Sequence, residues 1–139
     1  MRMRHIAPSA ARLVAAGIFV LSLAPGVALA ASADKEIATA AKHAGLAGNS
    51  QNIIGVRTHL HHAINCLEGP KGAAFDAKEL NPCADLGNGA IPDTTDTATV
   101  ATLRKADDLA VAGVAASDLA AARKAARDTE AMLDQAMKK

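Results

Sequence analysis

Large aromatic side chains are almost absent from this 139-residue chain, which has no tryptophan, no tyrosine and two phenylalanines. Proteins that bind single-stranded nucleic acid stack bases on aromatic rings and hold phosphates on a concentrated basic surface. The chain has 15 basic and 14 acidic residues, so it has no strong excess of positive charge either. We therefore predict no nucleic-acid partner. Its core must be built from aliphatic side chains, especially alanine, each of which buries little area.

Long hydrophobic runs are missing as well, except near the N-terminus. Residues 13–23 are almost wholly apolar, follow a leader with three arginines, and precede the sequence VALA, whose small-x-small ending signal peptidase accepts. This pattern predicts a secretory signal at residues 1–30 and one small domain at residues 31–139. The alternative, a retained membrane anchor, needs a run of about 20 apolar residues. We expect a periplasmic or secreted protein with no membrane span after the signal is removed.

Cysteine is scarce, since Cys66 and Cys83 are the only two. They lie 17 residues apart, and an exported protein reaches an oxidising compartment, so a disulfide between them is predicted. Closing a loop of this length contributes roughly 3 kcal/mol to stability. In the alternative interpretation, Cys66 remains a thiolate and binds a metal ion, which leaves Cys83 without a role.

Much of the remaining sequence has apolar residues at the three- and four-residue spacing of amphipathic helices. The spacing predicts four helices: 34–47, 51–67, from about 95 to 113–116, and from 117 to the C-terminus. Ser32, Ser50 and the cluster at 93–96 are the candidate N-caps, and Ser117-Asp118 is predicted to start the fourth helix. The inward-facing positions are predicted to be Ile37, Ala40, Ala41, Ala44, Ala47, Ile53, Val56, Leu60, Ala63, Ile64, Leu67, Val100, Leu103, Ala106, Ala110, Val114, Leu119, Ala122, Ala126, Thr129, Leu133 and Ala136 or Met137.

Residues 68–92 interrupt this periodicity with repeated glycine, proline and asparagine, which are typical of turns. Within this stretch, only residues 75–80 are predicted to form a short helical turn. The expected fold is therefore all-α, an antiparallel four-helix bundle with a long disulfide-tied loop between the second and third helices. The charged residues of the last two helices, including Asp107, are predicted to face solvent.

Three histidines, His59, His61 and His62, are concentrated in the sequence THLHHAINCLEG of the second predicted helix. At about 100° per residue, His59 and His62 lie on the same edge of the helix, beside its apolar stripe, whereas His61 lies on the other flank. Imidazoles three residues apart can chelate one metal ion because they lie on neighbouring turns. The alternative is a structural role for histidines at the boundary of the core.

A third ligand is predicted on the first helix. In an antiparallel hairpin whose turn centres near Asn49, His43 lies about one turn from the level of His59. The candidate metal site is therefore His43, His59 and His62, completed by a carboxylate from another helix or by water. Imidazole ligands suit Cu(II), Ni(II), Zn(II) or ferrous iron. Because HExxH and CxxCH motifs are both absent from the sequence, we expect neither a zinc protease nor covalently attached haem, and no enzyme activity.

The helix sequences AKHAGLA and HLHHAINC, in an exported and alanine-rich chain, resemble those of the small periplasmic metal-binding bundle proteins of bacteria. This resemblance implies divalent-metal binding through His43, His59 and His62. The sequence HLHHAINCLEGP followed by NPCADLGNGA is similar to a pattern of uncharacterised secreted bacterial proteins. The architecture is also similar to the periplasmic b-type cytochrome bundles, which hold haem with a methionine of the first helix and a histidine of the last. Those ligands are absent from the corresponding predicted helices, so no haem is expected.

Two functions follow from the sequence. The first is a protein that binds a divalent transition metal through helix histidines. The second is a structural or interaction module of the cell envelope, which binds an envelope protein or another copy of itself and uses no metal.

Overall fold

The computed structural model describes residues 26–138, with side chains from residue 32 onward, and this part of the chain is helical without any strand. The all-α class is therefore confirmed. Most of the predicted signal, residues 1–25, lies outside the described residues, and its last five residues continue the first helix. No described helix has the length and apolar character needed to cross a membrane. The helices are α1 (Gly26–Asn49), α2 (Ile53–Glu68), α3 (Ala90–Asp93), α4 (Thr97–Ala115) and α5 (Leu119–Ala136).

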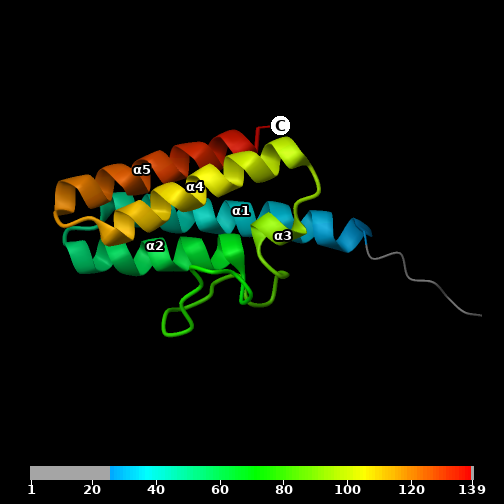
Figure 1. The fold of residues 1–139 in the computed structure, drawn as a ribbon, viewed down its shortest axis with the longest axis horizontal. Coiled ribbons are helices and arrows are strands. Elements are labelled where there is room, and N and C mark those ends of the chain that lie inside the picture. The colour runs from blue at the N-terminus through cyan, green and yellow to red at the C-terminus, as the bar shows by residue number, and fades with distance from the viewer. Residues whose placement is uncertain (1–25, 139) are drawn as a thin grey trace, which may run out of the picture.

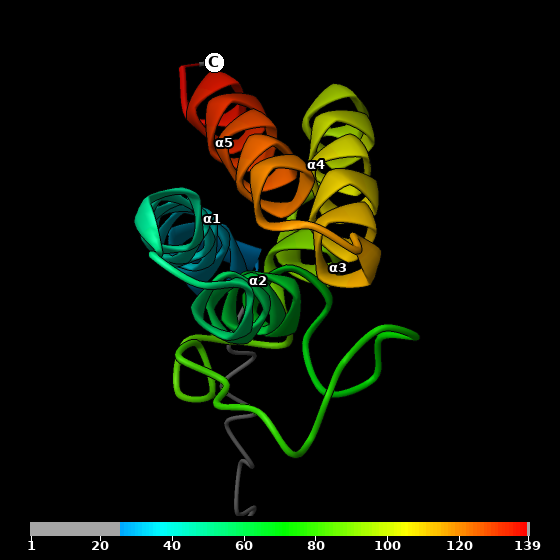
Figure 2. The same ribbon diagram turned by 90° about the vertical axis from the view of Figure 1, so that its left-hand side faces the viewer.

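The four long helices lie side by side, and the short α3 packs against α1 near the end where that helix starts (Figure 1). Helix α1 packs mainly on α2 and α5, and α4 packs mainly on the same two helices. In the end-on view, residues 69–89 extend away from the helices on the side of α2 (Figure 2). We call this segment, which connects α2 to α3, the tied loop.

Polar side chains at the helix ends set where each helix begins and ends. Asn52, Asp96 and Asp118 accept hydrogen bonds from the backbone N–H groups three residues later and cap α2, α4 and α5. The predicted caps Ser50 and Ser32 are wrong, because Ser50 precedes the cap and Ser32 lies inside α1. At the other end of α1, the Gly48 carbonyl accepts hydrogen bonds from the guanidinium groups of two α5 arginines.

The core lies along the helix stripes that the spacing predicts. Nearly all of the predicted inward-facing residues are buried, and alanine is the commonest residue among them. Small side chains let helix backbones approach closely, which is how a core with few large groups reaches a high packing density. The exceptions are residues at the ends of stripes, such as Met137, which is exposed.

The tied loop is held to the bundle at several points. Cys66 of α2 and Cys83 of the loop form a disulfide with their Cα atoms 5.1 Å apart, so Cys66 is not a free thiolate. The side chain of Asn65 is fully buried and donates from Nδ2 to the carbonyls of Asp76, Glu79 and Leu80, and its Oδ1 accepts from the Asp76 N–H. Of the helical turn expected at 75–80, the structure has a single hydrogen-bonded turn, in which the Glu79 N–H donates to the Asp76 carbonyl at 3.1 Å, and no longer helix.

The two ends of the tied loop meet at glycines. Gly69 and Gly89 have φ values of 66° and 116°, which are unfavourable for residues with a side chain. A Cβ atom on Gly69 would overlap the carbonyl oxygen of Asn88, and one on Gly89 would lie 2.6 Å from the backbone nitrogen of Gly69. The chain therefore leaves α2 and returns to α3 through a single narrow crossing.

Two carboxyl groups are buried next to other carboxyl groups. Asp107 is buried instead of facing solvent as predicted, and burial together with the neighbouring Glu68 raises its pKa to about 7. Glu36 of α1 is fully buried and accepts a hydrogen bond from the Gly89 N–H. Burial raises the pKa of Glu36 to about 7, a net result in which the Gly89 hydrogen bond opposes the shift and the charge of Asp93 adds to it.

Replacing Glu36 with glutamine is expected to stabilise the protein at pH 8.5 by about 3 kcal/mol. The folded-state pKa of Glu36 lies above its ordinary value of 4.5, so the folded state binds this proton more tightly. The resulting stability is complete below pH 4.5 and is lost as the pH rises through about 7. Urea unfolding at pH 4 and pH 8.5 measures the difference.

The control Asp34→Asn removes an exposed charge from the same helix and should change the free energy of unfolding little. Equal stability of Glu36→Gln and wild type at pH 8.5 would contradict the prediction.

Candidate metal centre

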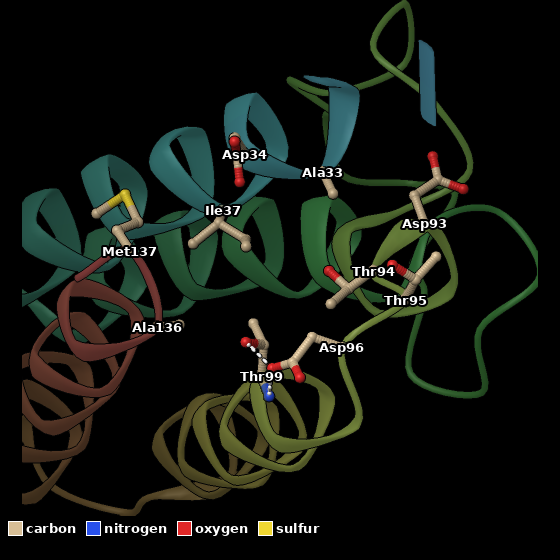
Figure 3. A pocket seen from close by; sticks show the side chains of 10 residues that line it. All are labelled: Ala33, Asp34, Ile37, Asp93, Thr94, Thr95, Asp96, Thr99, Ala136 and Met137. Atoms are coloured by element: carbon tan, nitrogen blue, oxygen red, sulfur yellow. Dashed lines mark hydrogen bonds between the residues drawn. The ribbon is translucent and has the colours of Figure 1, made fainter. Parts of the chain in front are cut away.

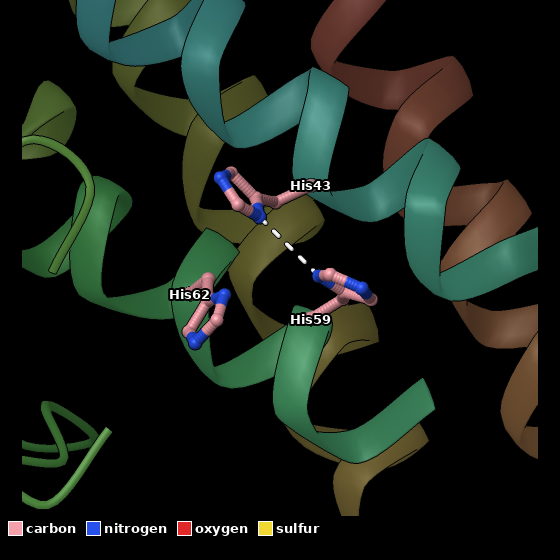
Figure 4. A group of neighbouring side chains, drawn as sticks. All are labelled: His43, His59 and His62. Carbon is pink, nitrogen blue, oxygen red and sulfur yellow. Dashed lines mark hydrogen bonds between the residues drawn. The ribbon is translucent and has the colours of Figure 1, made fainter. Parts of the chain in front are cut away.

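Three histidines meet between α1 and α2. His43 comes from α1, and His59 and His62 come from successive turns of α2 (Figure 4). The Nδ1 atoms of His43 and His59 are 3.5 Å apart, so these two side chains are level, and the predicted offset of one turn is wrong. The difference arises because α1 continues to Asn49 and the connection to α2 runs through residues 50–52, which moves the centre of the hairpin along the chain.

The rings are arranged so that their nitrogen atoms converge. The centroid of the His62 ring lies 5.1 Å from that of His43 and 5.6 Å from that of His59. The plane of the His62 ring is nearly perpendicular to the planes of both other rings. One nitrogen from each of the three residues can be chosen so that all lie within 4.8 Å of one another. Figure 4 shows one nitrogen of His62 facing the space beside the other two rings.

The environment of the cluster favours the neutral form of two of its imidazoles, those of His43 and His62. Burial, together with positive charge on His62, His59 and Lys42, lowers the pKa of His43 to about 4. Burial also lowers the pKa of His62, with a further lowering by His59 that Glu79 partly opposes. A neutral imidazole has a free electron pair on one nitrogen, which is the form that binds a metal ion.

One polar atom in the cluster is buried without a hydrogen bond. His62 is 9% exposed, and its Nδ1 has no hydrogen-bond partner within the described part of the chain. Buried polar atoms are almost always bonded, so an unpartnered one needs an explanation. A metal ion bound by His62 Nδ1 would supply the missing partner.

The spacing of the nitrogens suits a small transition metal ion. Zinc binds imidazole nitrogen at about 2.0–2.1 Å, which places two nitrogens of a tetrahedral site about 3.4 Å apart. The 3.5 Å separation of His43 Nδ1 and His59 Nδ1 matches this value. The other separations, none above 4.8 Å, can shorten by side-chain rotation. Three imidazoles leave a fourth position for water or another ligand.

The other sequence candidates lie outside this group. His61 is not among the three clustered residues, as its position on the opposite flank of the helix predicts. Cys66 is buried in the disulfide.

One neighbour of the cluster was not predicted from the sequence. Glu79 of the tied loop places its Oε2 atom 3.7 Å from His62 Nε2. The predicted disulfide could have indicated that Glu79 lies near His62, because these two residues each precede one of the bonded cysteines by four residues.

A hollow of about 460 Å³ lies at the opposite end of the helices, where α1 starts (Figure 3). Two of its three carboxylates have local structural partners: Asp96 accepts from Thr99 at the start of α4, and Asp93 accepts from the backbone and side chain of Asn88. The hollow therefore lacks the convergence of imidazole nitrogens that distinguishes the histidine group.

In comparisons with known proteins, no family model, no curated protein and no solved structure matches this chain.

Proposed function

We propose that this chain binds one divalent transition metal ion through His43, His59 and His62. The observation that carries this proposal is the convergence of three imidazoles, one of which, His62, has a buried and unpartnered Nδ1 atom. An all-nitrogen site of this kind favours Cu(II), Ni(II) or Zn(II) over magnesium or calcium, which prefer oxygen ligands. We propose binding of the ion and no catalysis.

We also propose that the protein is exported. Removal of a signal at residues 1–30 would leave a single domain, residues 31–139, in the periplasm or outside the cell. The Cys66–Cys83 disulfide supports this location because disulfides persist in oxidising compartments. We propose that the domain is an antiparallel four-helix bundle similar to the small periplasmic metal-binding proteins. The antiparallel arrangement is supported by Figure 1, in which the chain reverses direction from each long helix to the next.

Metal binding is expected to raise the stability of the protein. A ligand that binds the native state alone at 100 times its dissociation constant stabilises it by about 2.7 kcal/mol. Thermal melting of the purified protein with Zn(II), Ni(II) or Cu(II) tests this, and isothermal titration calorimetry gives the stoichiometry, expected to be one ion per chain. His43→Ala and His59→Ala should abolish the shift.

His61→Ala is the matched control because it removes an imidazole from the same turn of α2 outside the cluster. It should keep the full metal-dependent shift. A melting temperature unchanged by all three ions would overturn the proposal and favour the interaction module, and equal loss of binding in His61→Ala would show that binding is not specific to the cluster.

A further inference from the structure

The two ring nitrogens of His62 face different surroundings. Its Nδ1 is buried and unpartnered, whereas its Nε2 lies 3.7 Å from Glu79 Oε2. A metal-binding histidine usually donates its second ring N–H to a carboxylate, which fixes the tautomer and the orientation of the ring. With Nε2 protonated and directed at Glu79, the free electron pair of His62 is on Nδ1, the atom available to the cluster.

The position of Glu79 is set by the attachments of the tied loop. The buried Asn65 amide donates to the Glu79 carbonyl at 3.4 Å and to the carbonyls on either side of this stretch, at Asp76 and Leu80. The disulfide fixes the loop again four residues later, at Cys83. The Glu79 side chain is one-third exposed, so it lies at the boundary between solvent and the buried face of His62.

The distance between the two groups leaves room for a small adjustment. At 3.7 Å, Nε2 and Oε2 form a contact of ion-pair range, about 0.7 Å longer than a good hydrogen bond. Rotation of the partly exposed glutamate side chain can shorten it. When a divalent cation binds at Nδ1, it makes the Nε2–H group more acidic and so a stronger hydrogen-bond donor to a carboxylate.

We propose that Glu79 is a positioning residue for metal binding, which holds His62 in the tautomer that presents Nδ1 to a divalent transition metal ion. The inference rests on the proposed function of the histidine cluster. It gives the tied loop a role at the site: the helices supply the three imidazoles, and the loop supplies the carboxylate that orients one of them.

The test measures Zn(II) affinity by competition with a chromophoric chelator for wild type, Glu79→Gln and Glu79→Ala. The dissociation constant is expected to rise about tenfold in Glu79→Gln and further in Glu79→Ala. Asp85→Asn is the matched control, because it removes one exposed negative charge from the same loop, and it should stay within about twofold of wild type. Melting of the metal-free proteins checks that Glu79→Gln, which keeps the size of the side chain, is folded.

A second measurement separates orientation from a merely structural effect. Long-range ¹H–¹⁵N spectra of the zinc-bound protein should show His62 bound through Nδ1 and protonated at Nε2, with slow exchange of that proton in wild type and Asp85→Asn. The exchange should accelerate in both Glu79 variants.

The possible results separate the two proposals. If wild type binds zinc one to one, and Glu79→Gln binds it as tightly with an unchanged His62 signal, the role of Glu79 is refuted and the metal site stands. Coordination of zinc by Nε2 of His62 would also refute the positioning role. If wild type binds no ion, the proposed function itself fails.

Discussion

Gly69→Ala is expected to destabilise the protein by about 4 kcal/mol or more, the largest single effect that we predict. The residue has a φ of 66°, and a Cβ atom there would overlap the backbone of Asn88. Backbone atoms cannot move away as a flexible side chain can, so the crossing of the two loop ends would have to open. Urea unfolding followed by circular dichroism measures the loss.

Gly55→Ala provides the matched control. Gly55 lies in the first turn of α2, has no positive φ, and its added Cβ would lie 3.2 Å from a side-chain atom, Ser50 Oγ, instead of overlapping backbone. Alanine is the better helix former by up to about 1 kcal/mol, so this variant should be neutral or slightly more stable. Similar destabilisation of both variants would show that the loop crossing has no special importance.

Asn65→Asp is expected to cost about 4 kcal/mol, because it places an unpaired negative charge in a fully buried position. The new carboxylate would face three carbonyl oxygens that now accept hydrogen bonds from the Asn65 amide. The same change should weaken metal binding, since the segment that carries Glu79 loses its attachment to α2. Unfolding in urea and zinc competition on the folded fraction measure the two effects.

Asn81→Asp is the corresponding control within the tied loop. The side-chain oxygen of Asn81 accepts a hydrogen bond from the Cys83 N–H, and a carboxylate can accept the same bond. We expect a change within about 0.5 kcal/mol. If Asn65→Asp were equally mild, the buried amide would not be what holds the loop.

Much of the fold follows from the periodicity of the sequence. Apolar residues at helical spacing identify α1, α2, α4 and α5 to within a few residues, apart from the longer start of α1, and the predicted core positions are largely buried. The same geometry separates His61 from His59 and His62, because angular position on a helix depends on residue number alone. His43 could be placed only as closely as the hairpin connection could be located, and that connection differs by a few residues from the expected one.

The rest depends on contacts that have no periodic signal. Glu79 and Asn65 meet across a loop whose path is set by side-chain hydrogen bonds and a disulfide. Asp107 and Glu36 are acidic residues on amphipathic helices, where exposure is the ordinary expectation, and each is buried beside a second carboxyl group. Residue type alone therefore gives the wrong environment for Asp107.

The glycine crossing has a consequence for how this molecule could diversify. Because the tied loop starts and ends at one place, its length and sequence can vary at a small entropic cost while the path of the helices is kept. Under the proposed assignment of ligands, the scaffold would retain its three imidazoles while exchange of the intervening segment replaced the outer carboxylate. Ion preference could then be tuned by grafting loops, without redesign of the helical interior.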